Sequence, residues 1–199
     1  MSNKEVTAVI TENKIKNECT DVSYPQVAGL KSENVQTKLN LFISKQVLDL
    51  IPKEGCQVYE TIKGTYEVKL NRNGILSLKF NVYTFKKHAA NGLDVQKSIT
   101  VNLETGKIYQ IYDLFKRNSN YRAVITRMIK EQIKERDLPL IKEFKGIGDN
   151  ESFYLTNNAL VIYFQEIEFT PHYVGIPEFT IPFNQIKNLI NEEGPIARL

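Results

Sequence analysis

Two segments of the chain place apolar residues three and four positions apart, the spacing that gathers side chains on one face of a helix. The first begins at Ser32, a residue suited to the N-cap, and ends before Pro52. The second runs over residues 120–136. The predicted apolar stripes are Val35, Leu39, Phe42, Ile43, Val47 and Leu50 in the first helix, and Tyr121, Val124, Ile125, Met128, Ile129 and Ile133 in the second.

Elsewhere apolar and polar residues alternate, which is the pattern of half-buried strands. The clearest case is a hairpin over residues 65–85, whose turn contains Asn73 and Gly74, a pair suited to positive φ. Shorter alternating runs predict strands at residues 6–10, 99–103, 153–155, 160–164 and 179–183, and short helical turns are expected at 112–115 and 184–190.

Strands joined by hairpins, together with two main helices, predict an α+β protein in which the helices pack on antiparallel sheets. The order of elements does not alternate as in the βαβ units of a parallel sheet. Each half of the chain carries one long helix and one hairpin, although no residue-level repeat relates the halves. We therefore expect two halves, residues 1–95 and 96–199, packed as one compact unit.

Composition narrows the class of protein. The chain has 199 residues, of which 42% are hydrophobic and 25% charged, as in ordinary soluble proteins. The net charge of +3 at pH 7 and the mixing of acids with bases argue against a nucleic-acid partner. No apolar run approaches the roughly 20 residues that span a bilayer. No signal peptide is visible, so we expect an extracytoplasmic protein if a leader or anchor was removed, and a cytoplasmic one otherwise.

The sequence offers little evidence of metal or cofactor chemistry. Cys19 and Cys56 are the two cysteines, and they could form one bridge or remain two buried thiols. They are not in a C-x-x-C pair, and no histidine cluster accompanies them, which argues against zinc. A nucleophile elbow and a P-loop are both missing from the sequence. We therefore expect no cofactor and no metal.

Three residues could serve a hydrolase or transferase that acts on wall material: Glu166, Glu168 and His172. On a strand, Glu166 and Glu168 would point to the same face, and paired carboxylates are what glycosidases use. For this alternative the three side chains must converge in a pocket with a perturbed environment. Solvated acids at a strand end are the commoner arrangement, so no catalytic residue is predicted.

Aromatic residues and loops give a different signal. The chain has 10 tyrosines and 10 phenylalanines but no tryptophan, and several tyrosines lie in or beside loops. Exposed tyrosine offers a partner a large contact area with a polar tip. Binding loops are commonly carried by a rigid sheet, and the segments 86–92 and 170–177 are the best candidates. The predicted ligand-binding residues are Tyr83, Lys87, His88, Asn91, His172 and Tyr173.

Several short motifs, in a consistent order, resemble paired bacterial domains of unknown function of the DUF4163 and DUF3298 type. Residues 24–29, which read Tyr-Pro-Gln-Val-Ala-Gly, and the helix that follows resemble the N-terminal domain of the pair. The C-terminal half is similar to its usual companion. The matching pieces there are residues 98–103, 105–107, 113–115, 153–156, 171–175 and 179–183.

The resemblance implies an α+β module found mainly in Gram-positive bacteria, usually outside the membrane behind an anchor. Proteins of this type include the extracytoplasmic part of a lysozyme-binding anti-sigma factor and the N-terminal region of a peptidoglycan deacetylase. No shared catalytic residues come with the family. The resemblance thus predicts a non-catalytic cell-envelope binding or sensor module for a lysozyme-like protein or a wall polymer such as a peptidoglycan fragment. The enzyme described above and an intracellular interaction protein remain alternatives.

Overall fold

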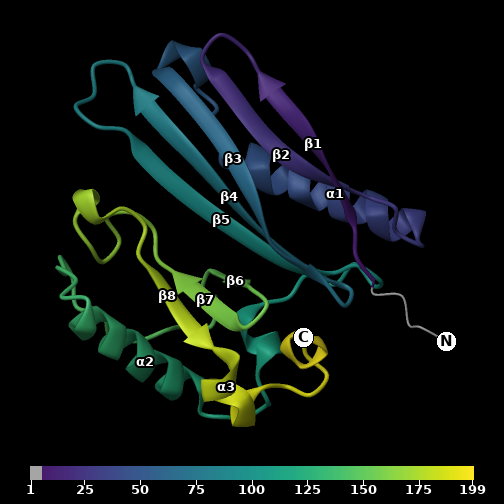
Figure 1. The fold of residues 1–199 in the computed structure, drawn as a ribbon. Coiled ribbons are helices and arrows are strands. Elements are labelled where there is room, and N and C mark those ends of the chain that lie inside the picture. Colours follow the sequence, from purple (N-terminus) through teal and green to yellow (C-terminus); the bar gives the residue numbers. More distant parts are fainter. Residues whose placement is uncertain (1–5) are drawn as a thin grey trace. The chain divides into compact units, whose positions relative to one another are not determined.

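A computed structural model describes residues 6–199 and divides the chain into two units between Lys107 and Ile108 (Figure 1). The predicted α+β class is confirmed, because each unit contains one sheet together with helices. The division expected between residues 95 and 96 falls inside strand β5 (Leu93–Asn102). The hydrogen bonds of β5 to its neighbour run from Leu93 to Asn102, which keeps the whole strand in the first unit.

The first unit is a five-stranded sheet in the order β1-β2-β3-β4-β5. Its strands are β1 (Val9–Lys16), β2 (Thr20–Ala28), β3 (Tyr59–Arg72), β4 (Ile75–Lys86) and β5. All neighbouring strands are antiparallel except β2 and β3, which run parallel where residues 20–22 pair with residues 62–64. The sheets are thus mainly antiparallel, as predicted, and this short parallel contact is an exception. It arises because helix α1 carries the chain back across the sheet between the two strands (Figure 1).

Helix α1 (Glu33–Leu48) confirms the predicted first helix. The hydroxyl of Ser32 accepts a hydrogen bond from the backbone N–H of Val35 at 3.3 Å, as expected of an N-cap. Asn40 joins the helix to β2, because its side chain both accepts from the N–H of Val27 and donates to the Val27 carbonyl, at 2.7 and 2.9 Å. Three residues of the predicted stripe are fully buried: Leu39, Ile43 and Val47.

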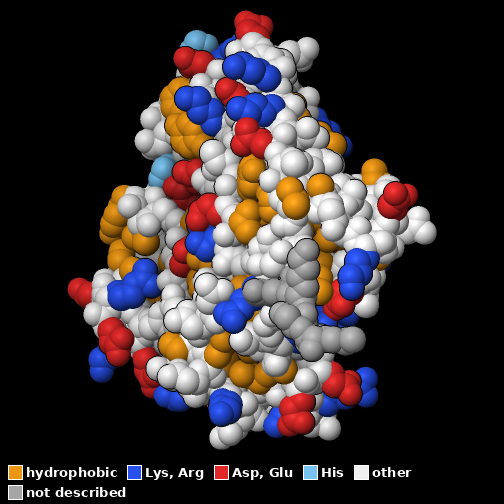
Figure 2. Space-filling model, turned by 45° about the vertical axis from the view of Figure 1, so that its right-hand side comes forward, with side chains coloured by type: hydrophobic (Ala, Val, Ile, Leu, Met, Phe, Trp, Pro, Cys, Tyr) orange, Lys and Arg blue, Asp and Glu red, His pale blue; other side chains and the backbone are white. Residues whose placement is uncertain are grey.

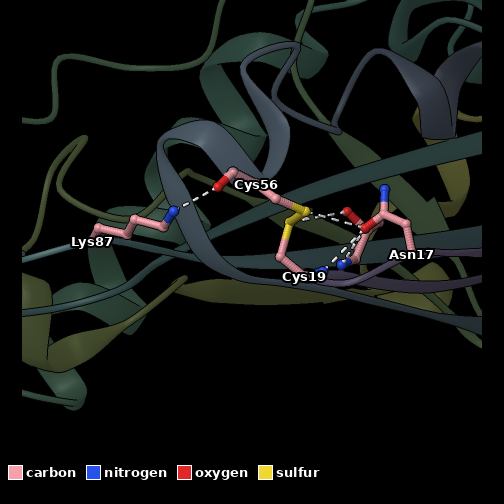
Figure 3. The surroundings of a disulfide bond; sticks show 5 residues. Asn17, Cys19, Cys56 and Lys87 are labelled. Carbon is pink, nitrogen blue, oxygen red and sulfur yellow. Dashed lines mark hydrogen bonds between the residues drawn. A yellow bond between two sulfur atoms is a disulfide. The ribbon is translucent and has the colours of Figure 1, made fainter.

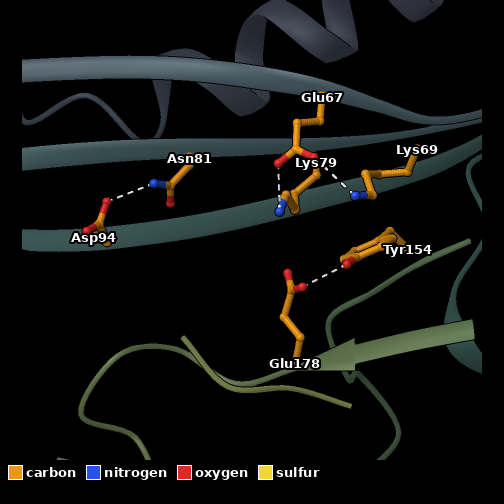
Figure 4. Close-up of polar contacts among 7 residues, drawn as sticks. All are labelled: Glu67, Lys69, Lys79, Asn81, Asp94, Tyr154 and Glu178. Atoms are coloured by element: carbon orange, nitrogen blue, oxygen red, sulfur yellow. Dashed lines mark hydrogen bonds and ion pairs between the residues drawn. The ribbon is translucent and has the colours of Figure 1, made fainter. Parts of the chain in front are cut away.

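The β3–β4 hairpin is confirmed and is longer than predicted. Asn73 and Gly74 have φ values of 49° and 76°, as a two-residue turn of this hand requires. Four apolar side chains of β4 lie on one face and are buried: Leu76, Leu78, Phe80 and Val82. In the middle of the strand the opposite face is polar. There Lys79 lies 2.7 Å from Glu67 on β3, and Asn81 donates to Asp94 on β5 at 2.7 Å (Figure 4).

The second unit contains the three-stranded antiparallel sheet β6-β7-β8. Its elements are α2 (Tyr121–Glu135), β6 (Phe153–Leu155), β7 (Ala159–Tyr163), β8 (Glu178–Pro182) and the short α3 (Phe183–Ile186). The second predicted helix is thus confirmed. Gln132 and Arg136 donate to the carbonyls of Thr180 and Glu178, at 2.9 and 2.8 Å. Side chains from the C-terminal end of α2 therefore cover the edge strand β8. Tyr154 also donates to the Glu178 carboxylate at 2.9 Å (Figure 4).

Two elements differ from their predicted limits. The first strand was expected at residues 6–10, but β1 begins at Val9 and continues to Lys16. Most β1 side chains are exposed because the strand lies at the edge of the sheet, so apolar alternation is a weak guide to its length. The helix expected at 184–190 is α3 followed by a 3₁₀ turn over Lys187–Leu189.

Candidate functional site

Four of the predicted ligand-binding residues lie at or beside the loop between β4 and β5 in the first unit. Tyr83 lies near the end of β4, and its ring covers Gly92: a Cβ atom on that glycine would fall 2.3 Å from the ring. A side chain at position 92 would therefore displace the Tyr83 ring from this position. Lys87, His88 and Asn91 are exposed, and His88 has a φ of 62°, in the left-handed region.

This loop is fastened to a cross-linked part of the same unit (Figure 3). Cys19 and Cys56 form a disulfide, which settles the choice that the sequence left open and joins the β1–β2 turn to the 3₁₀ turn over Gly55–Gln57. The ammonium group of Lys87 donates to the Cys56 carbonyl at 2.7 Å, and its backbone N–H donates to the carbonyl of Val58 at 3.0 Å. Lys87 thus holds the loop in place, and its charge lies beside the disulfide.

The other two predicted residues, His172 and Tyr173, lie in the second unit, in the connection from β7 to β8. Nδ1 of His172 lies 2.7 Å from Oε1 of Glu166, whose side chain is only 3% exposed. The chain makes a 3₁₀ turn over His172–Val174, and Gly175, with a φ of 73°, follows it. The Gly175 N–H donates to the His172 carbonyl at 2.9 Å. His172 therefore fixes the base of a tight turn that presents Tyr173.

Tyr173 is 80% exposed, the largest exposed fraction among the large hydrophobic side chains that stand out from the surface. Two half-exposed isoleucines, Ile141 and Ile167, belong to the same end of the unit. The backbone N–H of Ile141 donates to the Phe169 carbonyl at 2.9 Å, and Ile167 lies two residues before Phe169. We call Ile141, Ile167 and Tyr173 the aromatic-loop surface.

Packed phenylalanine rings support the aromatic-loop surface. Phe144 lies 5.3 Å from Phe164 and 5.5 Å from Phe169, and the last two rings are 4.9 Å apart, all measured between ring centroids. These tilted and edge-on contacts are the favourable geometries for aromatic pairs. Ile167 has a φ of 65°, which is unusual for a β-branched residue and indicates a strained backbone.

The structure brings together two of the three residues considered for catalysis. Glu166 and His172 form the pair described above. Glu168 instead accepts a hydrogen bond from the backbone N–H of Gln165 at 2.9 Å, so its carboxylate closes its own turn. Within residues 6–199, no group of three or more histidine, cysteine or acidic side chains is arranged to hold a metal ion.

Ile141 and Ile167 are the residues of this surface that sequence analysis did not identify. Both lie in segments without helical or strand periodicity, and Ile167 stands between two acids, Glu166 and Glu168. An isolated apolar residue in a charged loop is the available signal for such a position. The sequence gives no sign that the segments of Ile141 and Ile167 lie at the same end of the unit, because the hydrogen bond from Ile141 to Phe169 that joins these segments spans 28 residues.

Charge and hydrophobicity elsewhere do not suggest another class of partner. On the face drawn in Figure 2, lysine and arginine side chains are interspersed with acids rather than gathered into a basic stripe. Across residues 6–199, every helix is too short or too polar to cross a bilayer.

Comparison with known proteins confirms the resemblance. Residues 12–93 match the family described as deacetylase PdaC, and residues 112–184 match the family of proteins of unknown function DUF3298. The chain is similar to the anti-sigma-V factor RsiV of Bacillus subtilis (strain 168), with 28% identity over an alignment 210 residues long. The alignment covers 94% of this chain and 70% of that protein.

Solved structures show the same fold. A DUF3298 family member from Bacteroides fragilis aligns with a TM-score of 0.66 and 12% identity, covering 98% of this chain and 96% of that one. A DUF3298 family protein from Pseudomonas aeruginosa aligns with a TM-score of 0.59 and 12% identity, covering 94% of each chain.

Proposed function

We propose that this protein is a non-catalytic, extracytoplasmic binding module, and that its aromatic-loop surface contacts a protein partner of the lysozyme type. The similarity to an anti-sigma factor extends over 94% of the chain and supports a role in sensing by binding rather than in catalysis. The observation that carries the assignment of the surface is Tyr173, a tyrosine 80% exposed at the tip of a fixed turn.

The physical argument rests on the free energy of association. A tyrosine that is mostly in water gains little in the free protein, but when buried by a partner it contributes a large apolar area and a hydroxyl that can hydrogen-bond. The Glu166–His172 pair and the 3₁₀ turn fix the loop before the partner arrives, which lowers the entropy lost on binding. In this proposal the carboxylate–imidazole pair positions Tyr173 and performs no chemistry.

The disulfide supports the proposed extracytoplasmic location. Disulfides persist in oxidising surroundings and are rare in the reducing cytosol, so the Cys19–Cys56 bond favours an extracytoplasmic location. Labelling of the protein with a maleimide under denaturing conditions, directly after harvest of the cells that produce it, tests this point. We expect no labelling until a reductant is added. Two thiols that label without reductant would support the intracellular alternative.

The binding test uses the full chain and an immobilised c-type lysozyme, with soluble peptidoglycan fragments as a second ligand. We expect Tyr173→Ala to weaken lysozyme binding by a factor of about five or more, because truncating a tyrosine that is a hot spot of an interface costs more than about 1 kcal/mol. The matched control is Tyr112→Ala, since Tyr112 lies in the same unit and is 52% exposed. Its affinity should stay within about two-fold of the unsubstituted protein.

Three outcomes would contradict the proposal. The unsubstituted chain could fail to bind lysozyme while it binds peptidoglycan fragments, which would favour a wall-polymer module. The two tyrosine variants could lose affinity equally, which would remove the aromatic-loop surface from the contact. The chain could release soluble products from peptidoglycan and lose this activity in Glu166→Gln, which would restore the enzyme alternative.

A further inference from the structure

A cavity of about 430 Å³ lies beside α3 in the second unit, and we call it the α3 cavity. Its volume falls in the range of small-molecule sites. Phe183 at the start of α3 and Ile190 after the following 3₁₀ turn line the cavity. Leu199 and two residues of the 3₁₀ turn over Ile196–Arg198 complete its apolar lining. The α3 cavity shares no residue with the aromatic-loop surface and is therefore a separate site.

The apolar side chains of the α3 cavity are accessible to a ligand. Phe183, Ile190 and Leu199 are each partly exposed, whereas Ile196 is almost fully buried. Water in contact with apolar side chains is released when an apolar group of a ligand takes its place, and this release favours binding. The α3 cavity thus favours a ligand with an apolar portion.

Backbone hydrogen bonds hold the segments around the α3 cavity. The N–H of Lys116 donates to the carbonyl of Leu189 at 2.8 Å, directly before Ile190. The N–H of Leu199 donates to the carbonyl of Ile196 at 3.0 Å. A site whose walls are fixed before the ligand arrives loses less conformational entropy on binding. The cavity is therefore suited to a small ligand rather than to a partner that must reshape it.

The charged side chains of the α3 cavity indicate the head group of the ligand. Lys116 lies 3.4 Å from Glu192, so the charges of these two residues offset each other. Lys187 also lines the cavity, is exposed, and forms no ion pair with another residue of the range 6–199. A lysine beside an apolar cavity attracts an anion and repels a cation. A ligand that matches both features has an apolar body and one negative charge.

We propose that the α3 cavity binds an amphiphilic monoanion, namely a free fatty acid with a single aliphatic chain. The chain contacts Phe183, Ile190 and Leu199. The carboxylate accepts a hydrogen bond from the ammonium group of Lys187. This site does not depend on the proposed recognition of lysozyme, so the two proposals succeed or fail separately.

The test titrates the full chain by calorimetry with hexanoate, octanoate and decanoate, each below its micelle concentration. Each methylene group that becomes buried should raise the affinity by about four-fold. Decyl maltoside and decyltrimethylammonium carry the same chain on an uncharged and a cationic head group. Both should bind at least about three-fold more weakly than decanoate, because neither pairs with a lysine.

Ala197→Trp locates the aliphatic chain. Ala197 is exposed and lines the α3 cavity, so an indole at this position occupies the cavity without displacing the core. Decanoate affinity should fall by about ten-fold or more, as expected when several methylene groups lose their contacts. Ala123→Trp is the matched control, because it adds the same side chain to an exposed position of α2 outside the cavity. Its affinity should stay within about two-fold of the unsubstituted protein.

Lys187→Gln separates the head group from the chain. Decanoate affinity should fall by about three-fold, as for an exposed ion pair, while decyl maltoside affinity stays the same. The Tm without ligand should not change, because Lys187 is exposed and has no ion pair to lose. Lys130→Gln removes the same charge from the exposed middle of α2 and should leave decanoate affinity within about two-fold.

Several results would overturn the proposal. Decanoate could fail to bind, or the two tryptophan variants could weaken its binding equally, which would place the aliphatic chain outside the α3 cavity. Decyl maltoside or decyltrimethylammonium could bind as tightly as decanoate, which would leave an apolar site without preference for an anion. Lys187→Gln could weaken decanoate and decyl maltoside by the same factor, which would show that the lysine acts on the shape of the cavity rather than on the carboxylate.

Discussion

The two loops predicted to bind ligands are held in different ways and display different side chains. The β4–β5 loop of the first unit is fastened through Lys87 to the disulfide-bonded turn and exposes polar residues such as His88 and Asn91. The β7–β8 loop of the second unit is held by an ion pair and exposes Ile167 and Tyr173. Exposed apolar side chains gathered on a fixed loop mark a contact surface, whereas exposed polar ones need no partner. Tyr83 and Leu93 beside the first loop are also exposed, at 36% and 40%, but less than Ile167 and Tyr173, at 48% and 80%. We therefore propose that the second loop recognises the partner and that the first has a supporting role.

Removal of the disulfide should have the largest effect and should separate the two loops. The bond closes a sequence separation of 37 residues, for which chain entropy predicts a loss of about 4 kcal/mol of unfolding free energy in Cys19→Ser/Cys56→Ser. Urea unfolding measures the loss. Hydrogen exchange should show faster opening at residues 86–92 and unchanged protection at residues 165–175. Equal loosening of both loops would show that they are not fastened independently.

Removal of the Glu166 carboxylate should loosen the second loop alone. Glu166→Ala deletes a buried hydrogen-bonded acid, and we expect a loss of about 2 kcal/mol in unfolding free energy. Lysozyme affinity should fall as well, because Tyr173 is then less fixed before binding. Glu168→Ala is the matched control in the same loop, and its exposed carboxylate should contribute about 0.5 kcal/mol. Equal affinities in the two variants would show that the ion pair does not position Tyr173.

The contrast also shows which features local sequence can reveal. Helix α1 was predictable because Ser32 and the apolar stripe act within one helix, and the hairpin because Asn73 and Gly74 adopt positive φ locally. The parallel contact of β2 with β3 pairs only three residues across the sheet and leaves no periodic signal.

The candidate site was predicted less completely than the fold. His172 and Tyr173 could be chosen because exposed tyrosines and loop histidines are recognisable residue types. The pairing of Glu166 with His172, and the meeting of Ile141 with the Phe169 segment, depend on how the loops fold back in space. The disulfide could not be predicted for the same reason, since a sequence with two cysteines does not show whether they come close enough to bond.

A third prediction concerns the strained backbone at Ile167. Other positive-φ residues of the chain include Asn73 and Asn118, and asparagine tolerates this conformation far better than isoleucine does. Ile167→Asn should therefore raise the unfolding free energy by about 1 kcal/mol, because the side chain is half exposed and little burial is lost. Lysozyme affinity should fall, since an apolar contact is removed. A variant that is stabilised and binds equally well would remove Ile167 from the aromatic-loop surface.

The smallest expected effect tests whether the polar face of the first unit serves stability. The pKa of Glu67 lies below its ordinary value of 4.5, first because its side chain hydrogen-bonds to Lys79, with a further contribution from Lys69, while partial burial opposes the shift (Figure 4). An acid with a lowered folded-state pKa stabilises the protein above pH 4.5, and this contribution is lost as the pH falls through the folded-state value. The Glu67 side chain is 52% exposed, so solvent screening limits the effect to less than about 1 kcal/mol.

Urea unfolding of Glu67→Gln across this pH range measures that contribution. At pH 7 the unfolding free energy of the variant should be lower than that of the unsubstituted protein by less than about 1 kcal/mol. The two unfolding free energies should converge in acid as Glu67 becomes protonated. Glu60→Gln is the matched control, because it removes one exposed carboxylate from the same strand. Lysozyme affinity should be the same in both variants at pH 7. If Glu67→Gln lowered that affinity as Tyr173→Ala does, recognition would extend to the first unit and the division of roles between the two loops would fail.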